Sequence, residues 1–142
     1  MERIVVGVDG SEAGQDALRW AVAEAQSRGA HLQIVHAWQL PYVGPTPFAG
    51  MAIDLDDLEA SARAELEQAV ADIDLTGLAA PAEMVLVNRA PAVALVEAAK
   101  GADLLVVGTR GRGGFAGLLL GSVSQQLTHH APCPIVIVPH QE

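Results

Sequence analysis

Short apolar runs alternate with helical patterns along this chain, and this alternation constrains the fold more than any other feature. The runs cover residues 4–8, 31–38, 83–87, 104–107 and 135–138. The first run, residues 4–8, does not alternate apolar with polar side chains, which is typical of a parallel strand buried on both faces. Helical spacing fills the segments between them. The order β-α-β-α-β-α-β-α-β predicts an α/β fold, a parallel sheet covered on both faces by four helices, with right-handed crossovers.

Helix start and stop signals delimit the first two helices. Ser11 suits the N-cap of the first helix, and Gly29 suits its end. Asp54 is placed to cap the second helix. The apolar spacing of the second helix predicts one buried stripe, made of Leu55, Leu58, Ala62, Leu66, Ala69 and Ile73. Residues 39–52, which precede this helix, are rich in proline and glycine and predict an irregular loop.

The last two helices are shorter. Pro91 suits the first turn of a third helix, which ends near Gly101. Residues 122–130 have helical character, and Pro132 breaks this fourth helix. His129 and His130 sit at its end, where histidines are favourable, and no further metal ligands stand at a suitable spacing.

Length and composition define the class of protein. The chain has 142 residues, which predicts one domain over residues 1–142. The formal net charge is −9, with 8 Lys and Arg against 17 Asp and Glu, which argues against a nucleic-acid binder. One cysteine, no signal-peptide pattern and no apolar stretch long enough to span a bilayer predict a cytoplasmic protein with no membrane partner.

Two strand ends carry the residues from which a binding site is predicted. The first strand ends in Gly7-Val8-Asp9-Gly10-Ser11, and the fourth ends in Gly108-Thr109-Arg110-Gly111-Arg112-Gly113-Gly114. Ligands of open parallel sheets bind beyond the carboxyl ends of the strands, where the winding reverses. If the first and fourth strands are neighbours, the strand order is 3-2-1-4-5, a Rossmann-like three-layer sandwich in which both loops border one crevice.

The second of these loops has the composition of a phosphate site. Glycines let successive backbone N–H groups turn inward around an anion. The loop leads to Gly121-Ser122 at the start of a helix, where free N–H groups and the helix dipole attract anions. Ser122 and Ser124 add hydroxyls, and Arg110 and Arg112 add positive charge. The loop therefore predicts a site for a triphosphate.

These residues carry a family resemblance that covers essentially the whole chain. Gly108, two residues, Gly111, nine residues and then Gly121-Ser122 resemble the nucleotide-binding signature of the universal stress protein family. Residues 4–11 at the start and residues 131–139 at the end also resemble that family. The combination is specific, although any one glycine pattern is weak. One position departs from the pattern: Arg89 stands where relatives often have glycine, two residues before Pro91.

The resemblance implies a fold, an assembly and a ligand. It implies five parallel strands with four helices, a homodimer joined along the last strand, and binding of ATP by members with an intact glycine signature. By the same resemblance, Asp9 lies near the ribose or its metal and Ala37 lies by the adenine. The implied nucleotide-binding residues are Gly7, Val8, Asp9, Gly10, Ser11, Ala37, Gly108, Thr109, Arg110, Gly111, Arg112, Gly113, Gly114, Gly121, Ser122, Val123 and Ser124.

Each of these assignments has a simpler alternative. The glycine run can be only a turn, Ser122 and Asp9 can be only helix caps, and the arginines can be solvated charges. A carboxylate beside a triphosphate is unfavourable without a bridging cation, so a role for Asp9 depends on Mg²⁺. Cys133 between two prolines is interpreted as a small buried hydrophobe.

Three functions remain open on this basis. The first is an ATP-binding regulator of stress or growth arrest with an unknown downstream protein partner and, at most, weak ATP hydrolysis. The second is an adenylating enzyme, for which Lys100 is the only lysine in the sequence and stands at the end of a helix. The third is an interaction module that needs no nucleotide, and the intact glycine loop argues against it.

Overall fold

The computed structural model of the protein describes residues 1–39, 54–109 and 122–140. Within these ranges five strands form one sheet in the order β3-β2-β1-β4-β5, and neighbouring strands run parallel. This confirms the predicted α/β fold and strand order. The elements are β1 Arg3–Val8, α1 Glu12–Arg28, β2 His31–Trp38, α2 Leu55–Ala71, β3 Glu83–Asn88, α3 Pro91–Ala99, β4 Leu104–Gly108, α4 Ser122–His130 and β5 Ile135–Val138.

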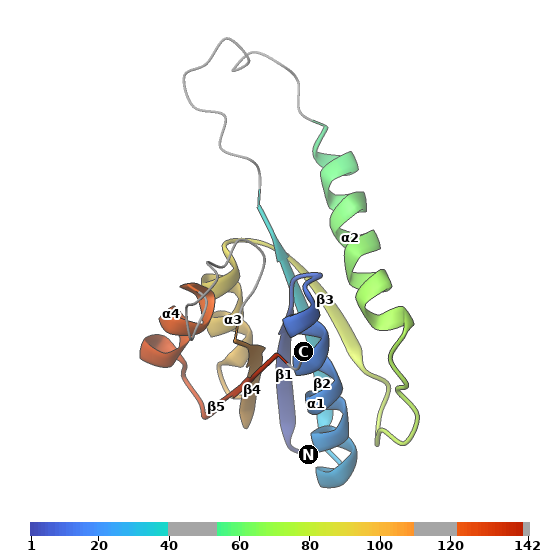
Figure 1. Ribbon diagram of the computed structural model, residues 1–142, viewed down its shortest axis with the longest axis vertical. Coiled ribbons are helices and arrows are strands. Elements are labelled where there is room, and N and C mark those ends of the chain that lie inside the picture. The colour runs from blue at the N-terminus through green and yellow to red at the C-terminus, as the bar shows by residue number, and fades with distance from the viewer. Residues whose placement is uncertain (40–53, 110–121, 141–142) are drawn as a thin grey trace.

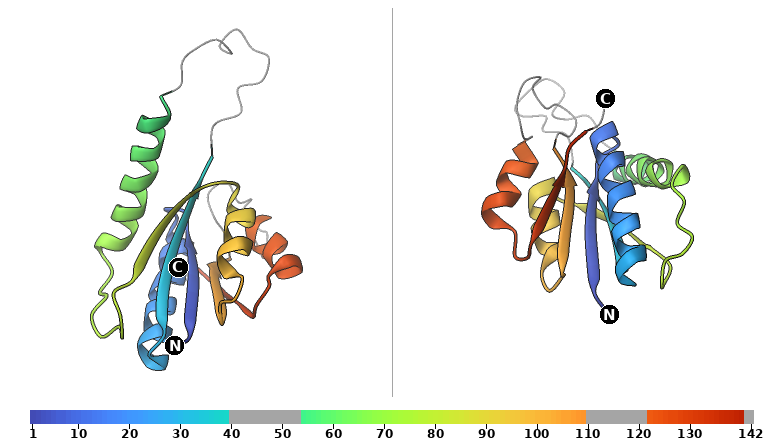
Figure 2. Two further views of the ribbon diagram at one scale, coloured as in Figure 1. Left: turned by 180° about the vertical axis from the view of Figure 1, so that it is seen from behind. Right: turned by 60° about the horizontal axis from the view of Figure 1, so that its bottom comes forward.

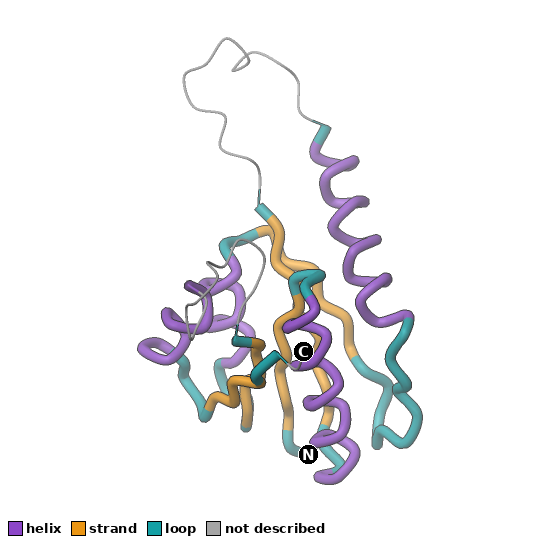
Figure 3. Tube along the Cα trace, in the orientation of Figure 1, coloured by secondary structure: helices purple, strands orange, loops and turns teal. Residues whose placement is uncertain are grey.

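The sheet is the central layer, with helices on both faces. In the right-hand view of Figure 2, α1 and α2 lie on one side of the sheet and α3 and α4 on the other. Figure 1 shows the same arrangement from the front, and Figure 3 shows how helix and strand alternate along the trace. The middle strands β1 and β4 have almost no exposed side chains, because helices cover them on both faces. Their sequences therefore lack the polar alternation of a half-exposed strand.

Successive side chains of the strands point to opposite faces of the sheet and belong to two apolar clusters, one on each face. Under α1 and α2 the core contains Ile4, Val6 and Leu18, and under α3 and α4 it contains Val5, Leu105 and Leu127. All six side chains are fully buried. The register pairs Ile4 with Leu104 and with Leu32, which stacks the apolar side chains of three strands in one layer. This packing fixes the carboxyl ends of β1, β2 and β4 side by side.

The predicted helix signals are confirmed at both ends of α1. The Ser11 hydroxyl accepts a hydrogen bond from the Gly14 backbone N–H at 3.1 Å, and Gly29 ends the helix with φ of 65°. The Asp54 carboxylate accepts hydrogen bonds from the backbone N–H groups of Asp56 and Asp57 at the start of α2. These contacts satisfy backbone groups that have no partner within their own helix.

The predicted buried stripe of α2 is wrong at its first position. Ala62, Leu66 and Ala69 are buried, but Leu55 is 51% exposed. Figure 1 shows the first turns of α2 rising beyond the edge of the sheet, so the strands do not pack against them. Helical spacing identifies which residues share a face, and it does not show where the opposing layer ends.

The described part of the chain contains no helix that is both long and apolar enough to cross a membrane.

Candidate functional site

A cavity of about 360 Å³ opens at the carboxyl edge of the sheet, between the ends of β1, β2 and β4. This is the edge at which ligands of open parallel sheets bind. The described residues that line it come from all three strand ends and from α1, α2, α3 and α4. They are Gly7, Val8, Asp9, Gly14, Val35, His36, Ala37, Trp38, Glu65, Pro91, Leu95, Val107, Gly108, Ser122, Val123 and Ser124.

Glycines let neighbouring elements approach each other closely around this cavity. A Cβ on Gly108 would lie 2.7 Å from the carbonyl oxygen of Ala13, and a Cβ on Gly7 would lie 2.8 Å from a methyl carbon of Leu95. The first contact is with backbone, which cannot swing aside as a side chain can. Gly108 is therefore needed because the first turn of α1 packs directly on the end of β4.

Asp9 is held in a tight turn at the start of α1. Its Oδ1 accepts hydrogen bonds from the Ser11 backbone N–H at 2.9 Å and from the Ser11 hydroxyl at 2.5 Å. Gly10 adopts φ of 82°, a left-handed conformation that glycine enters readily, and this makes the turn possible. The turn places the Asp9 carboxylate at the cavity wall beside Gly14, where a Cβ would lie 2.9 Å from Asp9 Oδ1.

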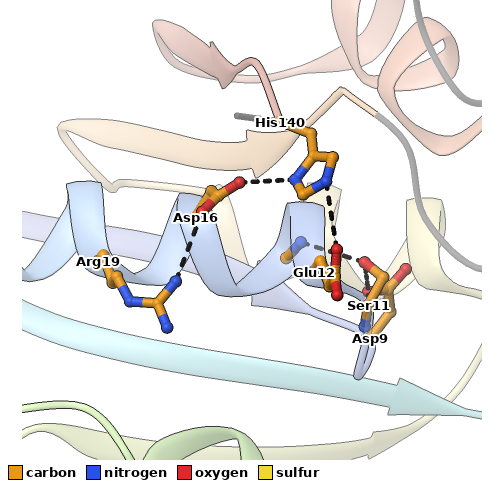
Figure 4. A network of polar contacts seen from close by, with 7 residues as sticks. Asp9, Ser11, Glu12, Asp16, Arg19 and His140 are labelled. Carbon is orange, nitrogen blue, oxygen red and sulfur yellow. Dashed lines mark hydrogen bonds and ion pairs between the residues drawn. The ribbon is translucent and has the colours of Figure 1, made fainter. Parts of the chain in front are cut away.

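Close to this turn, His140 connects the segment after β5 to α1 (Figure 4). Its Nδ1 lies 2.8 Å from Asp16 Oδ2, and its Nε2 lies 3.3 Å from Glu12 Oε2. In the first contact Nδ1 donates a hydrogen bond to the carboxylate, and the second contact is an ion pair when the imidazole carries two protons. The contacts hold the segment after β5 against α1.

The two serines of α4 occupy different positions. Ser124 is buried, and its hydroxyl donates to the carbonyl oxygen of Gly108 at 2.7 Å. With its proton in this bond, Ser124 joins α4 to β4 and has no proton to donate to a phosphate oxygen. Ser122 is exposed at the first position of α4 and lines the cavity. The geometry therefore favours Ser122 over Ser124 as a hydroxyl donor to an anion.

His36 and Glu65 form a polar pair in the cavity wall that was not predicted. His36 is 5% exposed, its Nδ1 lies 3.0 Å from the carbonyl oxygen of Val8, and its Nε2 lies 3.1 Å from Glu65 Oε2. A carbonyl oxygen only accepts, so Nδ1 carries a proton. A signal for Glu65 was available, because it is three residues from Ala62 and four from Ala69 on the buried stripe of α2.

The cavity wall is divided between an apolar and a polar side. Val35, Pro91, Leu95, Val107 and Val123 supply aliphatic surface from the face covered by α3 and α4. Asp9, His36 and Glu65 supply polar groups. Among the described lining residues there is no lysine or arginine. The arrangement suits a ligand with an apolar body and several hydrogen-bonding groups.

The structure brings many of the predicted site residues together. Gly7, Val8, Asp9, Ala37, Gly108, Ser122, Val123 and Ser124 line the cavity. Gly10 and Ser11 form the turn beside it, and the Thr109 backbone N–H donates to the Val138 carbonyl oxygen at 3.1 Å. The predicted residues Arg110, Gly111, Arg112, Gly113, Gly114 and Gly121 lie outside the described residues, as do residues 40–52 of the loop predicted over residues 39–52. The nucleotide contacts of all these residues remain predictions.

Four other residues discussed in the sequence analysis, Cys133, His129, His130 and Arg89, are not among the residues that line the cavity. Cys133 packs against the α3–α4 cluster, and burial raises the pKa of its thiol. His129 and His130 are exposed at the end of α4. Within residues 1–39, 54–109 and 122–140, no three His, Cys, Asp or Glu side chains are grouped to hold a metal ion by themselves. Arg89, in the turn between β3 and α3, forms an ion pair with Glu97 of α3 at 2.8 Å.

Comparisons with family models and with curated proteins point to the same family. A model of the Universal stress protein family matches residues 1–139. A universal stress protein of Thermus aquaticus is 43% identical over 139 residues, covering 95% of this chain and 96% of the relative. Other curated relatives are longer, and the chain spans about half their length, 44% to 48%.

Two solved structures are similar to this chain and contain nucleotides. A universal stress protein in complex with cAMP has 30% sequence identity and a TM-score of 0.74, covering 99% of this chain and 98% of that chain. The universal stress protein of Archaeoglobus fulgidus in complex with dAMP has 27% identity and a TM-score of 0.67, covering 97% of this chain and 98% of that chain.

Proposed function

The chain belongs to the universal stress protein family, and from this membership we propose that its cavity binds an adenine nucleotide, with ATP as the cellular ligand. The observation that carries the proposal is the position of the cavity. It lies where β1 and β4 end side by side, with Ser122 at the start of α4 on its wall. The nucleotides in the cAMP and dAMP complexes of similar proteins support the same class of ligand.

The proposed orientation places the phosphates at β4 and α4 and the base at β2. The first turn of α4 presents backbone N–H groups without helical partners, which attract anions. The glycine loop over residues 108–121 connects β4 to this turn, and Arg110 and Arg112 within it balance the phosphate charge. The base lies against Ala37 and the neighbouring aliphatic surface. Asp9 contacts the ribose, or a Mg²⁺ ion that accompanies the phosphates.

The role we propose is that of a cytoplasmic regulator in a stress or growth-arrest response, acting through an unidentified protein partner. A binding protein is favoured over an adenylating enzyme because of the location of Lys100, the only lysine in the sequence. Its carbonyl oxygen accepts a hydrogen bond from Arg3, the first residue of β1, at 2.7 Å. This places Lys100 at the opposite end of the sheet from the cavity.

A homodimer along β5 is part of the proposal. Within the described residues β5 pairs only with β4, so its other edge carries backbone groups without a partner strand. Exposed strand edges favour pairing with a second chain. Sedimentation velocity tests this assembly: a species of twice the chain mass supports it, and a monomer at high protein concentration contradicts it.

A thermal-shift measurement tests nucleotide binding. Mg-ATP at about one hundred times its dissociation constant adds about 2.7 kcal/mol to stability, which raises Tm by roughly several degrees for a domain of this size. The Gly111→Val and Gly121→Val variants are expected to lose this rise, because a branched side chain fills the space of the phosphates. Gly29→Val, at the far end of α1, serves as the matched control and is expected to keep the rise. Equal responses in all three variants would refute the site.

A further inference from the structure

Glu65 and His36 lie at the end of the cavity where the proposed function places the base. The ligand spans three strand ends, from Gly108 on β4, past Asp9 after β1, to Ala37 on β2. Neighbouring strands are about 4.8 Å apart, so this path is roughly 10 Å long. Glu65 reaches the cavity from α2, which packs on β2 and β3 rather than on β4. Its negative charge disfavours phosphate at this end.

The Glu65 carboxylate is fixed rather than free to turn. His36 is buried, and the bond from its Nδ1 to the Val8 carbonyl oxygen fixes the plane of the ring. Its Nε2 lies 3.1 Å from Glu65 Oε2 and donates to that carboxylate when the imidazole carries two protons, because an ionised carboxylate only accepts. The Glu65 side chain is 39% exposed and lines the cavity beside His36. A carboxylate has two oxygens with about four acceptor positions and serves several donors at once.

A fixed acceptor at the base end selects for an N–H donor on the base. The edge of adenine that distinguishes it carries the 6-amino group, which donates. A hydrogen bond to an ionised group is stronger than one between neutral groups. We propose that Glu65, held by His36, recognises the 6-amino group of adenine and makes the cavity selective for 6-aminopurine nucleotides. This inference rests on the proposed function, and in it Glu65 determines specificity while His36 is a positioning residue.

The test compares AMP with purine riboside 5′-monophosphate, which has hydrogen in place of the 6-amino group and is otherwise identical. Isothermal titration of the full chain is expected to show AMP binding about tenfold or more tightly. In Glu65→Gln the preference is expected to fall by at least about threefold, because the contact becomes neutral. In Glu65→Ala it is expected to disappear. Glu67→Gln removes the same charge from an exposed position of α2 and is expected to keep the full preference.

The possible outcomes separate this inference from the proposed function. If the parent chain binds AMP without preferring it over the analogue, or if Glu65→Ala keeps the full preference, Glu65 does not recognise the amino group and nucleotide binding stands. If the parent chain binds neither compound, the proposed function fails and the inference fails with it. If Glu65→Ala does not fold, Glu65→Gln decides: a preference unchanged from the parent chain would overturn the inference, and a preference lowered at least about threefold would support it.

Discussion

The Leu127→Ala variant is expected to lose about 2–5 kcal/mol of unfolding free energy, the range found for truncating a buried leucine. Leu127 is fully buried in the cluster beneath α3 and α4. The helix it anchors is short, with Ser124 as its other buried residue. Removing the Leu127 side chain therefore weakens most of the packing that holds α4 on the sheet. Because α4 carries Ser122 into the cavity, nucleotide affinity is expected to fall together with stability.

Urea unfolding and Mg-ATP titration at a temperature where the variant is folded measure the two effects. Gln126→Ala is the matched control, because Gln126 precedes Leu127 on the same helix and is exposed. It is expected to leave stability and affinity nearly unchanged. A Leu127→Ala protein with lowered stability and parental affinity would show that α4 does not contribute to the ligand site.

The Gly108→Ala variant is expected to be about 1–3 kcal/mol less stable and to bind nucleotide poorly, because the added methyl group overpacks a closely packed position. The new Cβ would lie 2.7 Å from the Ala13 carbonyl oxygen and 2.8 Å from the Ala13 carbonyl carbon. Only a shift of β4 or of the first turn of α1 relieves this contact. Either shift moves a wall of the cavity, since Gly108 and Gly14 both line it.

Gly29→Ala is the control for Gly108→Ala. Gly29 has φ of 65°, and a Cβ there meets no atom within 4 Å. An alanine in this left-handed conformation costs about 1–2 kcal/mol through backbone strain alone. Both variants are thus expected to be destabilised, and only Gly108→Ala is expected to lose affinity. Equal nucleotide affinity in the two proteins would contradict the role given to Gly108.

Most of the fold was predictable because local signals agreed with the global pattern. The bounds of β2, α4 and β5 match the predicted ranges, and Ser11 and Asp54 cap the helices they were expected to cap. Buried parallel strands produce continuous apolar runs, and capping residues have specific hydrogen-bonding roles. Both features can therefore be recognised in the amino-acid sequence. Leu55 was misplaced because its exposure depends on how far α2 extends beyond the sheet.

The site was only partly predictable, because side-chain partners depend on tertiary distances. Strand ends and glycines pointed to Gly7, Asp9 and Gly108, which line the cavity. Nothing in the sequence showed that the Ser124 hydroxyl would be taken up by the carbonyl oxygen of Gly108. The pairing of His36 with Glu65 joins residues 29 positions apart on different elements, and it depends on how α2 packs against β2.

The central claim is that an adenine nucleotide binds at the carboxyl ends of β1, β2 and β4, with its phosphates at the start of α4. Backbone amide chemical shifts recorded during a titration with Mg-ATP test it most directly. The account predicts saturable shifts at Val8, Asp9, Gly108 and Ser122, with little change at Gly29 and Gly101 at the opposite end of the sheet. Shifts confined to that opposite end, or no saturable shifts at millimolar Mg-ATP, would contradict it.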